Sequence, residues 1–289
     1  MRLNRRVALA AMLLGLLAAP LFAAHPDWTN SFPPFRIGGN LYYVGSEELA
    51  AFLIVTPQGN ILINSNLESS PAQIRRSVQA LGFRFRDIRI LLISHAHFDH
   101  AAGSASILRE THAKYEVMDV DVPVIESGGR DDFAFGRDKS MWWPPAHVDR
   151  ILHDGDTVEL GGTVLTARKT AGHTKGTTTW TMDVNEAGKR LHVVIVGSPN
   201  VLDSYRLIDN KAYPRIANDF LHQFEVLKAL PCDVFLGAHG QSFGLKEKYA
   251  RWKAGDKQAF VDPDGYGRYV DRKQRDFESA LKKQQAAVR

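Results

Sequence analysis

The chain has 289 residues, of which 44% are hydrophobic and 24% are charged, which is enough apolar material for one or two packed domains. The formal net charge is +4, but three arginines lie in the first 24 residues, and the remaining chain has 33 basic and 32 acidic residues. A balance this close to neutral argues against a nucleic-acid partner or binding to an acidic membrane surface. The function must therefore be sought in motifs.

The N-terminus carries an export pattern. Three arginines precede an apolar run over residues 7–19, and two small residues, Ala23 and Ala24, follow. This order is typical of a secretory signal peptide, and the run is short for the alternative, a membrane anchor. We therefore expect residues 1–24 to be a signal peptide that directs the chain to the periplasm. We expect residues 25–289 to form a single domain.

The first half of the mature chain mixes short strands with helices. Apolar patterning and turn residues predict strands at Leu41–Val44, Ala51–Val55, Asn60–Ile63, Ile90–Ile93 and Tyr115–Met118, and helices over residues 72–81 and about 103–110. Residues 128–147 form a long loop rich in Gly, Asp, Trp and Pro. A loop of this length inside a compact domain is usually functional or mobile.

The second half repeats this pattern of strands followed by helices. Strands are predicted at Thr157–Leu160, Thr163–Arg168, Thr177–Met182, Leu191–Val196 and Asp233–Leu236, and helices at Pro214–Leu230, about Lys246–Lys253 and Arg272–Gln284. Because strands precede helices in both halves, we expect two mixed β-sheets packed face to face with helices outside. This is a four-layer αββα sandwich of the α/β class.

The strand at residues 90–93 runs directly into a cluster of potential metal ligands. His95, His97, Asp99 and His100 lie within six positions. In an extended segment alternate side chains point the same way, so His95 and His97 can converge, while the next two come from the following bend. Imidazole and carboxylate without a nearby thiolate favour zinc. The alternative is a polar loop with surface histidines.

Two further histidines stand at strand ends beside glycines. His173 lies within Gly172-His173-Thr174-Lys175-Gly176, and His239 lies within Gly237-Ala238-His239-Gly240. A lone histidine is usually not a ligand, but a zinc site needs a ligand from elsewhere in the fold, which favours both. The single cysteine, Cys232, has apolar flanks and is expected to be a buried apolar residue. The other histidines lack the strand-end glycine setting: His25, His112, His147, His153, His192 and His222.

The motifs from His95 to His100, around His173 and around His239 resemble those of the metallo-β-lactamase superfamily. The resemblance implies an αββα sandwich with two zinc ions at one edge. It implies one zinc on His95, His97 and His173, and a second on Asp99, His100 and His239. This set, without a cysteine, is similar to subclass B3 of the β-lactamases. A departure is Asn64-Ser65-Asn66, which lacks the acid that many members have after this strand.

The resemblance also implies a function. A zinc-activated hydroxide would attack the amide of penicillins, cephalosporins or carbapenems and so confer antibiotic resistance. Asp99 and His100 are then also the candidate catalytic residues, because the metal they hold would stabilise the amide nitrogen as the ring opens. Ser198 and Asn200, after the strand at Leu191–Val196, are the candidate substrate-binding residues, and Asn200 stands where some B3 enzymes have a serine.

Alternatives remain at this point. The chain could hydrolyse another ester or amide, such as a lactone or a thioester, or bind zinc without catalysis, although open coordination positions argue against a purely structural site. The loop aromatics Phe135, Trp142 and Trp143 could cover the apolar face of a substrate or simply pack in the core. We expect a small-molecule β-lactam substrate, no nucleic acid, no membrane contact after signal cleavage, and a monomer.

Overall fold

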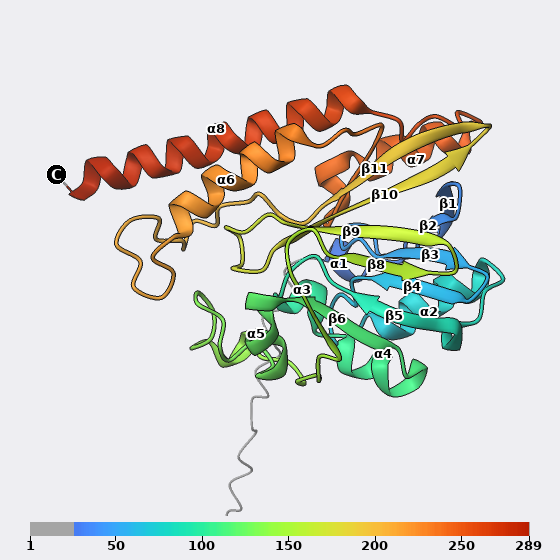
Figure 1. The fold of residues 1–289 in the computed structure, drawn as a ribbon, viewed down its shortest axis with the longest axis horizontal. Helices are drawn as coiled ribbons and strands as arrows, with labels where there is room; N and C mark the ends of the chain where they lie inside the picture. Colours follow the sequence, from blue (N-terminus) through green and yellow to red (C-terminus); the bar gives the residue numbers. More distant parts are fainter. Residues whose placement is uncertain (1–25, 289) are drawn as a thin grey trace, which may run out of the picture.

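The first layer of strands is a seven-stranded mixed sheet (Figure 1). The computed structural model describes residues 26–288, and the expected signal peptide lies outside these residues. The strands are hydrogen-bonded in sequence order: β1 (Phe35–Gly38), β2 (Leu41–Tyr43), β3 (Phe52–Thr56), β4 (Gly59–Ile63), β5 (Ile88–Leu92), β6 (Lys114–Met118) and β7 (Arg150–Leu152). Strands β4 to β7 are parallel, so their carboxyl ends meet at one edge of the sheet.

The second layer of strands is a five-stranded sheet in the order β12-β11-β10-β9-β8. Its strands are β8 (Thr157–Leu160), β9 (Thr163–Lys169), β10 (Thr178–Glu186), β11 (Lys189–Val196) and β12 (Val234–Gly237). Neighbouring strands from β8 to β11 are antiparallel, and β11 pairs with β12 in parallel. Two mixed sheets with helices outside confirm the expected αββα fold.

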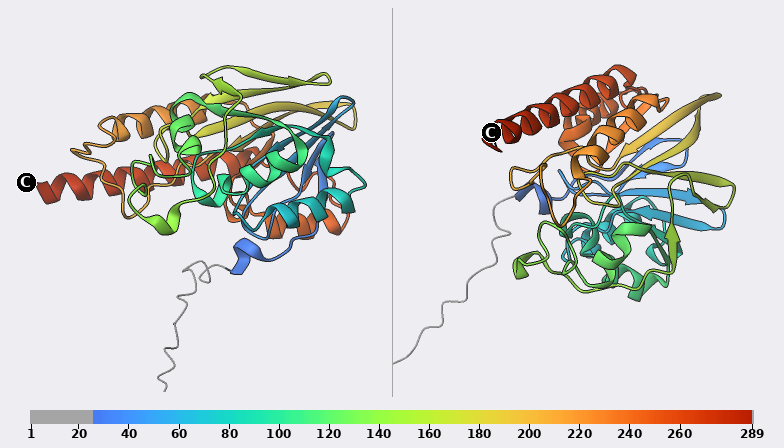
Figure 2. Two further views of the ribbon diagram at one scale, coloured as in Figure 1. Left: turned by 90° about the horizontal axis from the view of Figure 1, so that it is seen from below. Right: turned by 60° about the vertical axis from the view of Figure 1, so that its left-hand side comes forward.

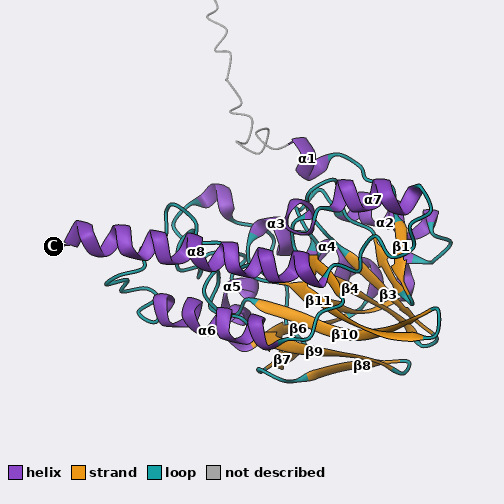
Figure 3. Cartoon of the chain, turned by 90° about the horizontal axis from the view of Figure 1, so that it is seen from above, coloured by secondary structure: helices purple, strands orange, loops and turns teal. Residues whose placement is uncertain are grey.

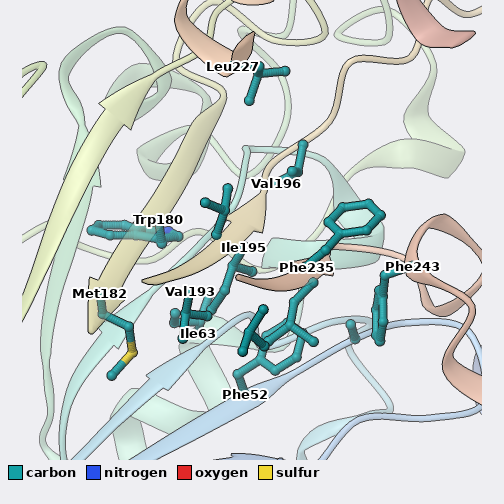
Figure 4. Packing of buried hydrophobic residues seen from close by; sticks show 14 of the residues in the cluster. Phe52, Ile63, Trp180, Met182, Val193, Ile195, Val196, Leu227, Phe235 and Phe243 are labelled. Carbon is teal, nitrogen blue, oxygen red and sulfur yellow. The ribbon is translucent and has the colours of Figure 1, made fainter. Parts of the chain in front are cut away.

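The core between the sheets is built from alternate strand residues. On β4, Ile61 and Ile63 face the second sheet, while Leu62 packs in the cluster under the outer helices. Both faces of this sheet are therefore buried, which explains the nearly continuous apolar runs of β4 and β5. Figure 4 shows Trp180 and Met182 of β10 close to β11, with Phe52 of the first sheet nearby.

Helices cover both outer faces (Figures 1 and 2). The first sheet is covered by α2 (Pro71–Ala80), α4 (Ser104–Thr111) and α5 (Val122–Glu126), whose apolar residues join one core cluster. The second is covered by α6 (Ile216–Ala229) and α8 (Pro263–Val288), which pack through Phe220 and Phe277 at 5.3 Å between ring centroids. The remaining helices are short: α1 (Pro26–Thr29), α3 (Phe98–Ala101) and α7 (Leu245–Lys253).

The helix bounds differ most from the sequence prediction at α8, which begins at Pro263 instead of Arg272. Asp262 precedes it, and its carboxylate accepts a hydrogen bond from the Gly265 backbone N–H at 2.8 Å. Gly265 and Gly267 weaken the helical pattern in sequence, but this N-terminal cap and the packing of Tyr266 and Tyr269 extend the helix. Figure 3 shows α8 running along one face of the molecule.

Other elements were not predicted because they are very short. These are β1, β7, α1, α3 and α5, each of three to five residues. The loop over residues 128–147 contains no regular α-helix or strand, as predicted, only a single turn at Lys139–Met141. Within residues 26–288 no helix combines the length and apolar character that crossing a membrane requires.

Candidate metal centre

The ligand-type residues of the first sheet follow β5. The strand ends at Leu92, and His95 and His97 lie in a bent segment over residues 94–97, in which His97 itself has an extended backbone. His97 directly precedes α3, so Asp99 and His100 lie in the first turn of that short helix. The bend expected after His97 is therefore a helical turn. His95 and His100 are fully buried, with 1% and 0% of their surface exposed.

Three histidines form the first candidate set. His95, His97 and His173 each offer a nitrogen, and these atoms lie within 4.8 Å of one another. The His173 ring lies 4.7 Å from each of the other two rings, measured between centroids. The buried Nε2 of His95 has no hydrogen-bond partner among the described residues. A buried polar atom without a partner is rare, and a metal ion would satisfy it.

Asp99, His100 and His239 form the second candidate set. Asp99 Oδ2 and His100 Nε2 are 3.1 Å apart, the Nε2 atoms of His100 and His239 are 3.1 Å apart, and His239 Nε2 lies 3.4 Å from Asp99 Oδ2. Tetrahedral ligands at about 2.0–2.2 Å from zinc are separated by roughly 3.3–3.6 Å. The 3.4 Å separation lies within this range and the two of 3.1 Å are slightly shorter, so small side-chain movements would fit the three atoms to one ion. His95 also lies within 4.8 Å of Asp99 and His100 ligand atoms, which makes the two sets contiguous.

The two sheets contribute different members of these sets. His173 follows β9, and His239 follows β12, both in the second sheet. Gly172 has φ of +143°, and a Cβ at this position would lie 2.8 Å from the Phe220 ring, so only glycine fits the turn before His173. The structure therefore brings together all six residues expected to be ligands.

Four of the five histidines have a polar group near their outer side, whereas the buried Nδ1 of His100 has no hydrogen-bond partner among the described residues. His173 Nδ1 donates to the Asn200 carbonyl at 2.8 Å, which leaves Nε2 for a metal. Behind His95 is the Ser94 hydroxyl, 3.2 Å from Nδ1. The other two partners are carboxylates: Glu48 lies 3.4 Å from His239 Nδ1, and Asp132 lies 3.6 Å from His97 Nε2. Such partners orient metal-binding imidazoles and raise their basicity.

Asp121 connects the two ligand-bearing loops. Its Oδ2 accepts from the Ala96 N–H at 2.9 Å and from the Thr174 hydroxyl at 2.8 Å, and its Oδ1 accepts from the Gly176 N–H at 2.8 Å. It is 1% exposed, and burial raises its pKa, although these hydrogen bonds act to lower it. Sequence reasoning missed it, although it follows β6, the parallel neighbour of β5, whose carboxyl end lies at the same edge.

Asn64 explains the missing acid after β4. Its side-chain oxygen accepts from the Ser94 N–H at 2.8 Å, and its amide donates to the Ala50 carbonyl at 3.1 Å. An amide can do both, whereas a carboxylate cannot donate to the carbonyl. Asn64 also has φ of +69°, a conformation that asparagine tolerates better than most residues. It therefore supports the start of the His95 loop.

The charge states of the metal-free site suit metal binding. Burial lowers the pKa of His95 well below its ordinary value and the pKa of His173 to about 3, so both rings are neutral. Burial alone would raise the pKa of Asp99, but His100 and His239 hold it well below its ordinary value. Burial opposes protonation of His239, yet the neighbouring carboxylates of Asp99 and Glu48 raise its pKa to about 9. Metal binding would displace that proton.

A cavity of about 340 Å³ opens onto both sets. The residues that line it come from the loops and from α8: Trp28, His97, Phe98, Asp99, Phe135, His173, Asn200, Leu202, His239, Gln241, Ser242, Tyr269, Arg272 and Lys273. Besides the predicted ligands that line it, sequence reasoning singled out Asn200 and Phe135, and it missed Trp28 and the three residues of α8. No pattern in the sequence marks α8 as part of a site.

Some residues expected near the substrate lie elsewhere. Ser198 is 4% exposed and does not line the cavity. Of the loop aromatics, Phe135 reaches the cavity, with its ring 5.4 Å from that of His97. Trp143 packs in the core under the outer helices, and Trp142 donates to the Gly136 carbonyl at 3.0 Å beneath Arg130. One aromatic of the loop is thus available to a substrate in this conformation.

Comparisons with known proteins agree with this fold. Residues 50–239 match the family model of the metallo-beta-lactamase superfamily, and the chain belongs to that superfamily. It is therefore a hydrolase of the metallo-β-lactamase kind. Its solved structural relatives include subclass B3 metallo-β-lactamases.

The native FEZ-1 metallo-beta-lactamase from Legionella gormanii is 55% identical, with a TM-score of 0.88, over 89% of this chain and 98% of that chain. The class B3 di-zinc enzyme LRA-12, from an Alaskan soil metagenome, is 36% identical, with a TM-score of 0.85, over 89% and 97%. A UPF0173 metal-dependent hydrolase from Anaeromyxobacter dehalogenans is 29% identical over 129 residues, which span 45% of this chain and 42% of that protein.

Proposed function

We propose that this chain is a zinc-dependent β-lactamase that hydrolyses the amide bond of β-lactam antibiotics: penicillins, cephalosporins and carbapenems. The observation that carries the proposal is the pair of contiguous ligand sets, free of cysteine, beneath a cavity large enough for a small molecule. The match to LRA-12, a class B3 di-zinc enzyme, supports two zinc ions per chain. Hydrolysis of these drugs would confer resistance on the cell that makes the protein.

In this proposal His95, His97 and His173 hold one zinc, and Asp99, His100 and His239 hold the other. Bound zinc lowers the pKa of water to about 7 and so supplies hydroxide at neutral pH for attack on the lactam carbonyl. The protein contributes imidazoles whose outer nitrogens face the Asn200 carbonyl, Glu48 and Asp132. Asp99 lines the cavity and His100 is fully buried, and the zinc that they would hold could stabilise the amide nitrogen as the ring opens.

We propose that Asn200 is a substrate-binding residue and that Ser198 supports it. Asn200 lines the cavity, and its backbone N–H lies 3.5 Å from the Ser198 hydroxyl. The Asn200 amide can donate to the carboxylate of a β-lactam, while its carbonyl positions His173. Substrate binding and the orientation of one ligand are thus coupled through a single residue.

Purified protein tests the proposal on four substrates side by side: a chromogenic cephalosporin, a carbapenem, a glutathione thioester and an acyl lactone. We expect β-lactam hydrolysis that a chelator abolishes and added zinc restores. Activity confined to the thioester or the lactone would overturn the proposal and favour the alternative hydrolase. Full β-lactam turnover by a preparation verified to be metal-free would overturn the zinc requirement.

We further propose that the protein acts in the periplasm as a monomer, with residues 25–289 as one domain. The basic, apolar and small segments at the N-terminus support export. Mass spectrometry of protein from the periplasm should give a chain that lacks its first 23 or 24 residues. An intact Met1 would contradict export by this signal, and light scattering measures the mass in solution.

A further inference from the structure

Two cations of α8 lie in the wall of the candidate active site. Arg272 and Lys273 both line the cavity that contains Asp99, His173 and His239. They come from the C-terminal helix, which covers the second sheet and belongs to none of the ligand-bearing loops. Their position beside the candidate metal ligands therefore results from tertiary packing. The question is which ligand two cations at this position would bind.

The base of this wall is Tyr269, one turn before the two cations. It is 4% exposed, and its ring centroid lies 5.5 Å from Arg272 Cζ and 5.9 Å from Lys273 Nζ. Its hydroxyl donates to Ser242 Oγ at 3.3 Å, in the short turn that follows His239. The ring also packs 5.2 Å from that of Phe235. Tyr269 thus fixes the cationic wall next to the second ligand set.

The positive charge of this wall is poorly balanced within the protein. Asp99 is the one acid among the described residues that line the cavity, and it already faces His100 and His239. Arg272 has no acidic group within 4.0 Å among residues 26–288, and Lys273 has one distant partner, Asp276, at 3.8 Å. Neighbouring like charges repel each other, so an anion in the cavity would be attracted to both.

Lys273 is also partly desolvated. Its side chain is 24% exposed, and burial lowers the pKa of its ammonium group. Withdrawing a cation from water has a cost that an anionic ligand would offset. In contrast, Lys282 and Lys283 further along the same helix are exposed and lie outside the cavity. Arg272 is exposed as well, so the first pair differs from the second in lining the cavity, and Lys273 differs also in being partly buried.

We propose that Arg272 and Lys273 bind a carboxylate of the substrate and thereby select acidic substrates. This inference rests on the proposed β-lactamase function. Ser198 and Asn200 were expected to donate hydrogen bonds to a substrate carboxylate, but Ser198 is buried and of the two only Asn200 lines the cavity. The two cations would supply the further donors that the carboxylate needs. A guanidinium and an ammonium offer charge-assisted hydrogen bonds to a carboxylate, stronger than those of a neutral amide. The carboxylate can belong to the β-lactam ring system or to an acidic acyl side chain.

Steady-state kinetics on zinc-loaded protein test the inference. The double variant Arg272→Gln/Lys273→Gln is compared with wild type and with the matched pair Lys282→Gln/Lys283→Gln, which removes the same charge from the same helix. The substrates are a cephalosporin with a neutral acyl side chain, one with an additional side-chain carboxylate, and a methyl ester of the ring carboxylate. The conservative double variant Arg272→Lys/Lys273→Arg tests whether charge alone suffices.

We expect Arg272→Gln/Lys273→Gln, the cavity variant, to raise KM about tenfold or more for a carboxylate-bearing substrate. Its kcat should stay within about twofold of wild type, since only an initial binding contact is lost. The matched pair and the conservative variant should stay near wild type. If the ring carboxylate is bound, the ester already has a high KM that the variant does not raise further. If the side-chain acid is bound, only that substrate is affected. Unchanged KM values for every acid would overturn the inference.

Phthalate binding separates this inference from the proposed function. NMR shifts of the Tyr269 to Lys273 amides are followed while phthalate is added to zinc-loaded protein. We expect saturable shifts in wild type and the matched pair, and their loss in the cavity variant. If wild type hydrolyses no β-lactam, the proposed function fails, yet these shifts still decide whether the wall binds carboxylates. Equal phthalate binding by all three proteins would overturn it.

Discussion

At the scale of single residues, Glu48 holds two groups beside the second ligand set. Its Oε2 accepts from the Gln241 N–H at 3.0 Å, and its Oε1 lies 3.4 Å from His239 Nδ1. With 7% of its surface exposed, Glu48 is nearly inaccessible to water that could replace either contact. A carboxylate can accept from both groups, whereas an amide has one accepting oxygen. Glu48 therefore sets the orientation of His239 without contacting a metal.

Glu48→Gln is expected to weaken the second zinc by about 10–100-fold while the first zinc stays bound, because the amide can satisfy only one of these two contacts. The measurement is zinc stoichiometry after dialysis against a competing chelator. Glu47→Gln is the matched control, since Glu47 pairs with Asn30 and Lys246 on the surface. Two tightly held zinc ions in the Glu48 variant would show that this contact is dispensable.

At the scale of elements, α8 is tied at its start to α7 and near its end to the segment that follows Asn200. At its start, Asp262 accepts from the Gly265 N–H and lies 2.9 Å from Lys248 Nζ on α7. Near its end, Gln284 donates to the Tyr205 carbonyl at 2.8 Å and accepts from the Leu207 N–H at 2.7 Å. The helix thereby secures the segment that follows Asn200.

The Asp262 contact predicts a dependence of stability on pH. Burial acts to raise the pKa of Asp262, but Lys248 and the Gly265 N–H hold it below its ordinary value. The stabilisation is therefore present above the unfolded-state pKa of about 4 and is lost as pH falls through the lower folded-state pKa. Asp262→Asn keeps the cap but removes the charge.

We expect Asp262→Asn to lower the free energy of unfolding by about 1 kcal/mol at pH 7, and this difference should shrink as pH falls below about 4. Urea unfolding across pH 3 to 7 measures it. Asp264→Asn removes an exposed charge from the same turn and is the control. A difference between Asp262→Asn and wild type that grows toward low pH would contradict the assigned sign.

Gln284→Ala is expected to loosen the segment after Asn200. Two backbone groups, the Leu207 N–H and the Tyr205 carbonyl, lose their partner, which should cost about 1–2 kcal/mol in local stability. The Tyr205 hydroxyl donates to the His173 carbonyl at 2.6 Å, so the loosening should extend toward that loop. Hydrogen exchange should be faster at Leu207 in this variant. The neighbouring change Gln285→Ala is the control, and equal exchange in both would contradict the prediction.

At the scale of the whole molecule, the candidate metal centre connects the two sheets. One part of each ligand set follows β5 of the first sheet, while His173 and His239 follow β9 and β12 of the second. Bound ions would therefore hold together two layers that otherwise meet through apolar packing. Any ligand that binds only the folded state adds to the free energy of unfolding by mass action.

Removing zinc should therefore lower the melting temperature, and restoring it should reverse the change. At a free zinc concentration of 100 times Kd, one site adds about 2.7 kcal/mol to the free energy of unfolding. His239→Ala should retain the contribution of the first site and lose most of the second, because two protein ligands remain where three stood. Calorimetry with and without chelator measures both. A melting temperature of wild type that does not respond to chelation would contradict this role.

The sequence was sufficient to determine the features that depend on local patterning. Alternating and continuous apolar runs predicted most strands, and the dense cluster from His95 to His100 predicted a metal centre, because ligands one to five positions apart converge through local geometry. Resemblance in three motifs indicated the six candidate ligands that the structure brings together. Very short elements such as β7 and α3 carry too few residues for a pattern and were missed.

The tertiary structure alone determined which distant residues share the cavity and support the ligands. Glu48, Asp121 and Asp132 are ordinary acids in sequence, and they gain roles because strand ends and loops from separate segments meet at one edge of the sandwich. Arg272 and Lys273 lie on α8, whose apolar periodicity indicates only which face is buried. Their position at the cavity depends on how α8 packs across the second sheet (Figure 3). Packing over long sequence separations has no local periodicity, and it can be seen only once the layers are assembled.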